Sequence, residues 1–198
     1  VIDEIKSEAD ESLRQISGID SDTFEKTSTA IKTRGFWLGT NLITALIAAS
    51  VINIFKETLE EVIFLAVLMP IIASMGGVAA TQTLTITVRG LALGQIVKAN
   101  YKYIFNRELI VGITNGFLWA IVLSLIACLW FQDWTLIWVI SLSMIINLLA
   151  GILSGMGIPI LMRSLKMDPA VAGSVIVTTV TDVVGFFSFL GFASYFYS

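Results

Sequence analysis

The chain has 198 residues, of which 56% are hydrophobic and only 14% are charged, and its formal net charge is −3. A soluble domain carries about 25% charged residues, so this composition excludes an ordinary soluble enzyme and a disordered chain and disfavours a nucleic-acid partner. The chain has no histidine, and its single cysteine, Cys128, lies in an apolar run. Histidine-based metal sites and disulfides within the chain are therefore excluded, and the composition indicates a polytopic membrane protein.

The first 34 residues differ from the rest and are predicted to be a cytosolic connecting segment. Apolar residues recur at helical spacing as far as Ile16, which predicts a short amphipathic helix ending near Gly18. Asp22 and Glu25 resemble a capping pair for a second helix. The chain opens with Val and shows no signal-peptide pattern, so we expect a fragment or a processed form of a longer protein.

Five apolar stretches follow, each long enough to cross roughly 30 Å of hydrocarbon at about 20 residues per helix. They lack the period-2 alternation of transmembrane β-strands, so an all-α membrane domain is predicted over residues 35–198. Residues 90–107 mix apolar and basic side chains, which predicts an amphipathic helix at the inner membrane interface. The five predicted spans are residues 36–55, 62–88, 109–131, 135–162 and 170–197.

The basic residues predict the orientation of these spans. With a cytosolic N-terminus, eleven of the twelve Lys and Arg residues lie on the inner side, and only Lys56 lies outside. This asymmetry predicts an N-in, C-out arrangement in the plasma or inner membrane of the cell. The outer side carries Glu57, Glu60, Glu61 and Asp133, which either gather cations at an entrance or form an ordinary solvated acidic loop.

Asp182 is the one ionisable residue of the last four spans that lies far from both ends of its span. It follows Ala170 by twelve residues, which is about 18 Å along a helix. A carboxylate at this depth costs roughly 2.5–3.5 kcal/mol, so water, a cation or a proton must offset the cost. An ion or proton site is favoured, and a protonated Asp bonded to a neighbouring helix is the alternative. Arg89 and Glu108 lie at span ends, where long side chains reach water.

Small and polar residues surround Asp182 at three- and four-residue spacing, which predicts one shared helix face. Such a face suits a water-filled pore, although glycines also suit close helix packing. Asp168, just before Pro169, is predicted to cap this helix, with a peripheral cation site as the alternative. The members of the face are Ser174, Thr178, Thr181, Asp182, Gly185 and Ser188.

The second span carries a similar polar face. Pro70 and the pair Gly76-Gly77 let this helix bend or let another backbone approach it closely. Two helices with small and polar faces and one intramembrane acid are the minimum required for a pore wall, so these faces are predicted to line one. The residues that share the face of the second span are Ser74, Gly77, Thr81 and Thr85.

The surroundings of Asp182 indicate which ion it suits. With no thiolate or imidazole nearby, oxygen ligands favour a hard cation over a soft transition metal. Mg²⁺ keeps its waters and is usually held through one or two carboxylates. One Asp per chain becomes two across the two-fold axis of a homodimer, which balances the charge of a hydrated dication. A proton relay would use the same residue.

These residues resemble the MgtE family of magnesium channels over the five spans from Gly35 to Tyr197. The resemblance rests on several motifs that occur in the family's order, and residues 1–34 are similar to the plug helix that joins the family's cytosolic regulatory domains to its membrane part. The motifs are Pro70 with Gly76-Gly77 and Gln82, Arg89-Gly90-Leu91-Ala92, Leu161-Met162-Arg163 leading to Asp168-Pro169-Ala170, and residues 179–185.

The resemblance implies a homodimer whose conduction path lies at the two-fold axis, walled by the second and fifth spans. It implies that Asp182 binds hydrated Mg²⁺, with the backbone carbonyl of Thr178 as a companion ligand. Glu108 and Asp168 match acidic positions on the cytosolic side where the family places additional magnesium. The expected partners are therefore a second copy of the chain, the lipid bilayer, Mg²⁺ and an N-terminal cytosolic regulatory domain.

The sequence departs from the family at three positions near the pore. The family usually has Gly-Gly-Asn with a further Gly two residues on, and an Asn early in the fifth span; here these places hold Val78, Ala80 and Ser174. Manganese, cobalt and calcium therefore stay alternatives to magnesium as the transported ion.

Three functions are consistent with the sequence. The first is a divalent-cation channel that moves Mg²⁺ down its electrochemical gradient, because a dication gains about 4.6 kcal/mol per 100 mV. The second is a proton- or sodium-coupled secondary transporter of another divalent cation such as Mn²⁺. The third is a non-transporting membrane anchor subunit. No nucleophile–base pair and no phosphate-binding loop is present in the sequence, so an enzyme is not expected.

Overall fold

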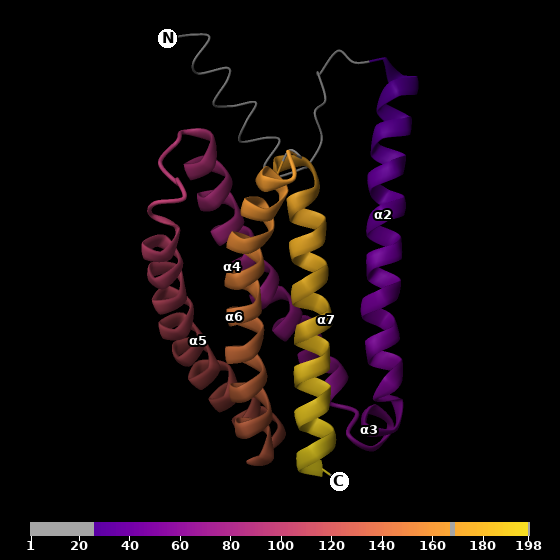
Figure 1. The fold of residues 1–198 in the computed structure, drawn as a ribbon. Helices are drawn as coiled ribbons and strands as arrows, with labels where there is room; N and C mark the ends of the chain where they lie inside the picture. The colour runs from indigo at the N-terminus through magenta and orange to yellow at the C-terminus, as the bar shows by residue number, and fades with distance from the viewer. Residues whose placement is uncertain (1–25, 167–168, 198) are drawn as a thin grey trace.

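The computed structural model describes residues 26–166 and 169–197, with only the backbone described at 169–172. The described residues form six helices and no strand (Figure 1). Five of these helices are long and apolar enough to cross a membrane, which confirms the predicted all-α class with five spans. The six helices are α2 (Thr27–Ile54), α3 (Lys56–Glu61), α4 (Leu65–Ala92), α5 (Tyr101–Phe131), α6 (Thr135–Ser164) and α7 (Pro169–Tyr197).

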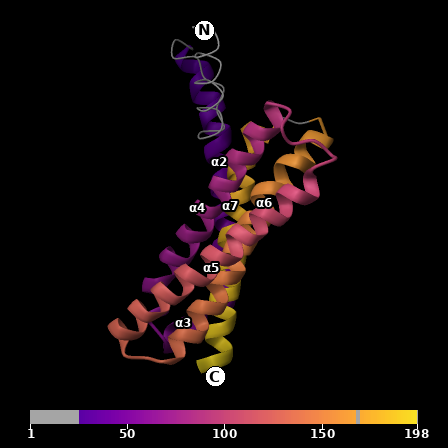
Figure 2. The same ribbon diagram turned by 90° about the vertical axis from the view of Figure 1, so that its left-hand side faces the viewer.

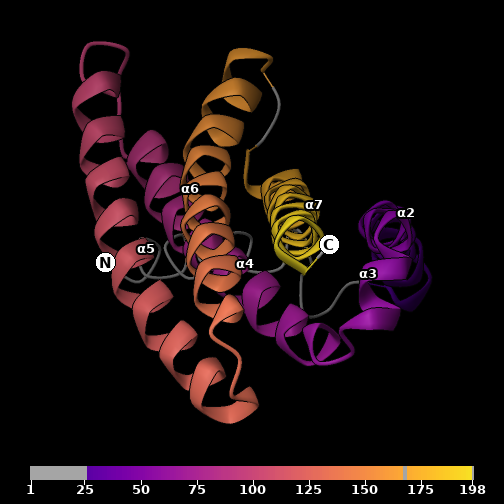
Figure 3. The same ribbon diagram turned by 90° about the horizontal axis from the view of Figure 1, so that it is seen from below.

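Helices α4, α6 and α7 pack on one another and form the centre of the bundle. Helix α5 packs on α6, and α2 packs on α7 at the opposite side, as the view in Figure 3 shows. In Figure 2, α5 runs diagonally across the face of the bundle, whereas α7 runs closer to the vertical. The main core joins α4, α6 and α7 through fully buried side chains such as Ile72, Ile140 and Phe189.

Two glycines of α6 let α4 approach at the distance of backbone contact. A Cβ atom on Gly151 would lie 2.8 Å from the carbonyl oxygen of Gly76, and one on Gly155 would lie 2.5 Å from that of Ala80. Small residues four apart are typical of such close crossings between membrane helices. Helix α4 is therefore held against α6 along the part of its length that carries the predicted polar face.

The two ends of the bundle differ in charge. The connections α4–α5 and α6–α7 lie at one end, here called the basic end because it carries Lys98, Lys102 and Lys166. The opposite end, here called the acidic end, contains α3 and the α5–α6 connection with Asp133. In Figure 1 the basic end is at the top and the acidic end, with the C-terminus, is at the bottom.

The predicted interfacial helix over residues 90–107 is wrong. Its first residues complete α4, residues 93–100 form turns, and the remainder begins α5. Gly94 has φ +67°, which ends α4, and the Ile96 amide donates a 2.9 Å hydrogen bond back to the Gly90 carbonyl. The side chain of Asn100 then stabilises the turn by donating to the Gln95 carbonyl at 2.7 Å.

Other boundaries differ less. Helix α2 starts at Thr27 and continues without a break past residue 35, where the membrane domain was predicted to begin. The acidic segment after α2 forms the short helix α3, in which Lys56 and Glu60 are exposed and 3.4 Å apart. An exposed ion pair of this kind contributes about 0–1 kcal/mol. The helix predicted before Gly18 and the capping pair Asp22 and Glu25 lie outside the described residues.

Candidate cation site

Asp182 lies near the middle of α7, as the sequence predicts, and its side chain is partly exposed. Within the described part of the chain, its carboxylate makes no hydrogen bond and no ion pair. A protonated Asp182, the alternative that the sequence leaves open, therefore has no partner for a hydrogen bond within the described part of a single chain. An acid at this depth without a protein partner is left for water, a cation or a proton to stabilise.

Helix α7 carries two adjacent faces where the sequence predicts a single one. Ser174, Thr178 and Asp182 follow one another at four-residue spacing and are partly or fully exposed. Thr181 and Gly185 are buried inside the bundle. At 100° per residue, Thr178 and Thr181 point about 60° apart around the helix. This angle is large enough for α4 and α6 to cover the face of Thr181 while the face of Thr178 stays open.

The structure thus corrects the prediction that Thr181 and Gly185 line the pore. The side chain of Thr181 is 0% exposed, and its Oγ1 would lie 3.9 Å from a Cβ atom on Gly77. A Cβ atom on Gly185 would lie 2.7 Å from the amide nitrogen of Asn147 on α6. Both residues hold helices together, and neither faces open space.

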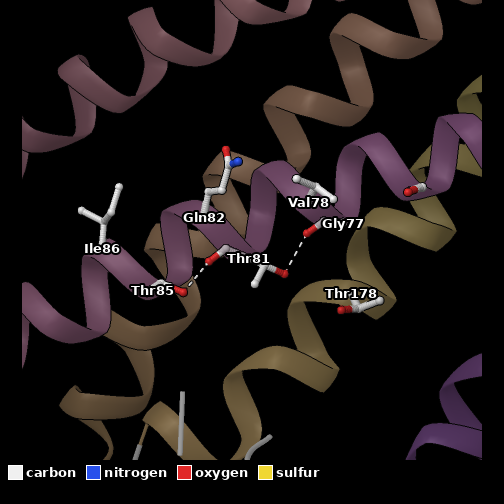
Figure 4. A pocket seen from close by; sticks show the side chains of 8 residues that line it. Gly77, Val78, Thr81, Gln82, Thr85, Ile86 and Thr178 are labelled. Carbon is white, nitrogen blue, oxygen red and sulfur yellow. Dashed lines mark hydrogen bonds between the residues drawn. The ribbon is translucent and has the colours of Figure 1, made fainter. Parts of the chain in front are cut away.

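Four predicted residues of α4 lie together with Thr178 of α7 along a groove of about 620 Å³, here called the α4–α7 groove (Figure 4). The groove is also lined by Val78, Gln82 and Ile86, and several of its residues are exposed on the surface of the chain. The structure thus brings five of the predicted pore-lining or ligand residues to one groove, whereas neither Ser174 nor Asp182 lines it. The predicted residues that do line it are Ser74, Gly77, Thr81, Thr85 and Thr178.

The threonine hydroxyls in the α4–α7 groove all donate to the backbone of their own helix. Thr81 donates to the Gly77 carbonyl at 2.8 Å, as Figure 4 shows, and Thr85 donates to the Thr81 carbonyl at 2.9 Å. Thr178 donates to the Ser174 carbonyl at 2.9 Å. Since each hydroxyl uses its proton this way, its lone pairs remain to accept from water. The groove therefore offers acceptors to the water shell of a cation.

The backbone carbonyl of Thr178, which the family resemblance implies as a ligand, already accepts a hydrogen bond. The Thr181 hydroxyl lies 2.9 Å from this carbonyl oxygen and 3.4 Å from the carbonyl oxygen of Val177. A cation at the Thr178 carbonyl would compete with the shorter of these two contacts. Thr181 is therefore next to the predicted ligand without facing the groove.

Glu108 is buried, which corrects the prediction that it reaches water at a span end. Helix α5 begins eight residues earlier than predicted, so Glu108 lies two turns inside it and is only 5% exposed. It lines a second cavity, of about 380 Å³, together with Gln82, Thr83 and Asn115. Gln82 also lines the α4–α7 groove and so contacts both spaces.

The predicted acidic residues do not form one metal cluster. Among the residues that the structure describes, no group of three or more Asp, Glu, Cys or His side chains is close enough to hold a metal ion. Glu108 and Asp182 lie on α5 and α7, which pack on different sides of α6. Asp168 lies outside the described residues. A cation held by Asp182 alone would therefore keep most of its water.

Fold and site together define a polytopic α-helical membrane protein with an open groove of apolar, small and hydroxyl-bearing residues. An intramembrane carboxylate without a partner in the described part of the chain lies one helical turn from this groove. The sequence model of the MgtE family, described as a divalent cation transporter, matches residues 69–192, which is more than half of the chain. The chain therefore belongs to the MgtE family, as its motifs predict. The family consists of transporters, which is consistent with the expectation that the chain is not an enzyme.

Three relatives extend this comparison. The chain is 31% identical over 198 residues to the magnesium transporter MgtE of Bacillus subtilis, covering 99% of this chain and 44% of the relative. It is 29% identical to that of Enterococcus faecalis, over 99% of this chain and 44% of the relative. It is 27% identical to that of Thermus thermophilus, over 98% of this chain and 44% of the relative. The chain thus spans less than half the length of these relatives.

Proposed function

We propose that this membrane domain conducts hydrated Mg²⁺ down its electrochemical gradient, with Asp182 as the intramembrane ligand. The observation that carries the proposal is the mid-helix carboxylate of Asp182, which has no partner in the described part of the chain and lies one turn from Thr178 in the α4–α7 groove. Relatives named as magnesium transporters support the choice of ion. Mg²⁺ is also a reasonable cargo because it is held through few carboxylates and keeps its waters.

The size of the α4–α7 groove is compatible with a hydrated ion. Six waters at about 30 Å³ each occupy about 180 Å³, and the groove measures about 620 Å³. The hydroxyl oxygens of Ser74, Thr81 and Thr85 would accept hydrogen bonds from the water shell. The carboxylate of Asp182 would supply the charge, and the membrane potential would supply the driving force.

A homodimer would complete this path. The groove is open at the surface, where Ser74, Val78 and Thr81 are exposed. A second copy related by a two-fold axis would cover the groove and bring a second Asp182 carboxylate to the ion. The path would then be walled by α4 and α7 of both copies.

Additional Mg²⁺ is proposed at Glu108 and at Asp168, as the family resemblance implies. The cavity beside Glu108 measures about 380 Å³ and also exposes the amides of Gln82 and Asn115, so it has room for an ion with its water shell. Residues 1–34 are proposed to connect this domain to a cytosolic regulatory domain. An N-in, C-out orientation would place the basic end in the cytosol, where Lys and Arg residues concentrate.

Uptake of Mg²⁺ into liposomes under an imposed inside-negative potential tests the proposal. The Asp182→Asn variant of the whole protein should lose about tenfold or more of its uptake, because the loss of about 1.4 kcal/mol of attraction to a dication corresponds to a factor of ten. Lys102→Gln removes an exposed charge from the start of α5 and serves as the control, with uptake near that of the parent.

Three results would contradict the proposal in different ways. Uptake that survives in Asp182→Ala would remove the assigned role of Asp182. Uptake that follows an imposed pH gradient or Na⁺ gradient at fixed potential would indicate a coupled secondary transporter. Absence of any ion flux from intact dimers would leave a membrane anchor as the function.

A further inference from the structure

A buried asparagine lies at the crossing of the three central helices. Asn147 is in the middle of α6 and its side chain is 0% exposed. Its Nδ2 donates a 2.8 Å hydrogen bond to the backbone carbonyl of Ile72 on α4. This bond joins residues 75 apart in the sequence, so it couples the position of α4 to that of α6.

The amide of Asn147 fills the space that two glycines leave empty. A Cβ atom on Gly76 of α4 would lie 2.6 Å from Cγ of Asn147, and one on Gly185 of α7 would lie 2.7 Å from its Nδ2. Real Cβ atoms do not approach other atoms this closely, so neither helix has room for a side chain here. The amide therefore acts as a spacer between α4 and α7.

Asn147 does not have the properties of a residue selected for stability. Its Oδ1 is buried and, within the described part of the chain, has no hydrogen-bond partner. A buried polar atom without a hydrogen-bond partner destabilises a fold, whereas a leucine of similar size would carry no such unpaired atom. A single buried Asn in a helical core is known to fix the register of helices at a cost in stability.

The helix positions that the Asn147 side chain influences are those of α4 and α7 beside the candidate cation path. Gly76 is followed directly by Gly77, which lines the α4–α7 groove. Gly185 lies three residues, or about one turn, after Asp182 on α7. A shift at the amide of Asn147 would therefore change the distance between the groove wall on α4 and the carboxylate on α7.

We propose that Asn147 is a positioning residue for ion selection, which holds α4 and α7 at the separation that suits a hydrated Mg²⁺. This inference rests on the proposed transport function. Asn147 itself contacts no ion, and it acts through the positions of Gly77 and Asp182.

The first test compares cations. Asn147→Leu in the whole protein should keep or raise the melting temperature, because the unpaired acceptor is removed. Its ratio of Mg²⁺ to Ca²⁺ uptake should change by about tenfold, as for other substitutions that act through packing on a distant site. The control is Ser143→Ala, one turn away on α6, since the Ser143 hydroxyl is equally buried but bonds only within α6. An unchanged ratio in Asn147→Leu would overturn the proposal.

The second test uses compensation between the two residues. Gly185→Ala should impair Mg²⁺ uptake in the parent, because the added methyl group meets the Asn147 amide. In the Asn147→Ala background the same change should restore uptake toward the parent level, since the space has been vacated. Gly157→Ala on α6, where a Cβ atom meets nothing within 4 Å, is the control in both backgrounds. Equal impairment by Gly185→Ala in both backgrounds would argue against the spacer role.

A third readout does not require transport. Cysteines at positions 77 and 181 should form a disulfide in a chain with Cys128→Ala, because a Cβ atom on Gly77 would lie 3.9 Å from the Thr181 hydroxyl oxygen. The rate of this cross-link should change in Asn147→Leu and stay unchanged in Ser143→Ala. Failure of the parent to take up Mg²⁺ would count against the proposed function, whereas an unaltered cross-link rate in Asn147→Leu would count against the positioning role.

Discussion

The hydroxyl of Tyr197 donates a 2.6 Å hydrogen bond to Oδ2 of Asp133 and so ties the last residues of α7 to the α5–α6 connection. The Thr135 amide donates to Oδ1 of the same carboxylate at 2.8 Å. Phe64 packs beside this contact, with its ring centroid 6.2 Å from that of Tyr197 and 5.0 Å from that of Phe131. The acidic end of the bundle is thus closed by one polar contact inside an aromatic cluster.

This contact predicts a loss of stability in acid. Burial raises the pKa of Asp133, but the hydrogen bonds from Tyr197 and Thr135 together outweigh burial and hold the pKa below its ordinary value. A carboxyl whose pKa is lower in the folded state stabilises the fold above its unfolded pKa, near 3.9, and loses this contribution as the pH falls through its folded pKa. Asp133→Asn should therefore flatten the decrease in melting temperature below about pH 4. An acid profile that is as steep in Asp133→Asn as in the parent would contradict this.

Removal of the Tyr197 hydroxyl should weaken the same end of the bundle at neutral pH. Tyr197→Phe keeps the ring against Phe64 and removes the donor, so it should destabilise the fold by about 0.5–1.5 kcal/mol. Thermal unfolding in detergent measures the change. Tyr103→Phe, on an exposed tyrosine of α5, is the control and should leave the melting temperature unaltered. Equal melting temperatures for Tyr197→Phe and the parent would show that the hydrogen bond contributes nothing.

The close crossing of α4 and α6 predicts opposite outcomes for two glycines of the same helix. Gly155→Ala should destabilise the fold by about 1–3 kcal/mol because overpacking forces the backbones apart, and its added Cβ would lie 2.5 Å from the Ala80 carbonyl oxygen. Gly157→Ala meets open space, so the higher helix propensity of alanine should be neutral or stabilising. Denaturation of both variants checks the pair. A tolerated Gly155→Ala would contradict the contact.

Arg163 should restrain the end of α4. Its Nη1 donates a 2.8 Å hydrogen bond to the Leu91 carbonyl, which belongs to the last turn of α4. A cation there also interacts favourably with the negative end of the helix dipole, which is worth about 0.3–1 kcal/mol. Arg163→Gln should therefore increase hydrogen exchange of the Leu93 and Gly94 amides, whereas Lys102→Gln should not. Equal protection of these amides in Arg163→Gln and the parent would rule out this role.

Thr181 should influence cation affinity although it is buried. Thr181→Val removes the hydroxyl that occupies the Thr178 carbonyl at 2.9 Å, so the carbonyl becomes a better ligand and Mg²⁺ should bind more tightly. Thr179→Val is the matched control, because the Thr179 hydroxyl bonds to the Val175 carbonyl instead. Mg²⁺ titration followed by protection from thermal unfolding measures the affinity. Weaker or equal Mg²⁺ binding in Thr181→Val would exclude the Thr178 carbonyl as a ligand.

Much of the fold can be predicted from the sequence because hydrocarbon imposes a simple condition. Long apolar runs must form helices in a membrane, since no other partner for their backbone is available. The ends of the helices are less certain. Tyr101 and Lys102 belong to α5 although they are not part of the apolar run, because an amphipathic segment continues an existing helix as easily as it forms a separate one.

The candidate site could be predicted only in part, because helical spacing gives a face but not what covers it. Thr178 and Thr181 are both compatible with one polar stripe, yet only the packing of α4 decides that Thr181 is buried. Glu108 is buried and not at a span end, because α5 begins at Tyr101 and the apolar run begins only at residue 109. Asn147 was overlooked, although an amide in the middle of an otherwise apolar fourth span is itself a signal for an interhelical contact.

The position of the bound ion tests the central claim most directly. The measurement is a crystal structure of the whole protein with Mn²⁺ in place of Mg²⁺, in which anomalous scattering marks the ion. The account predicts a peak beside the two Asp182 carboxylates on the dimer axis, between α4 and α7, with water in its coordination shell. A protein that transports Mg²⁺ but binds Mn²⁺ only at Glu108 or elsewhere, with the Asp182 carboxylates unoccupied, would contradict it.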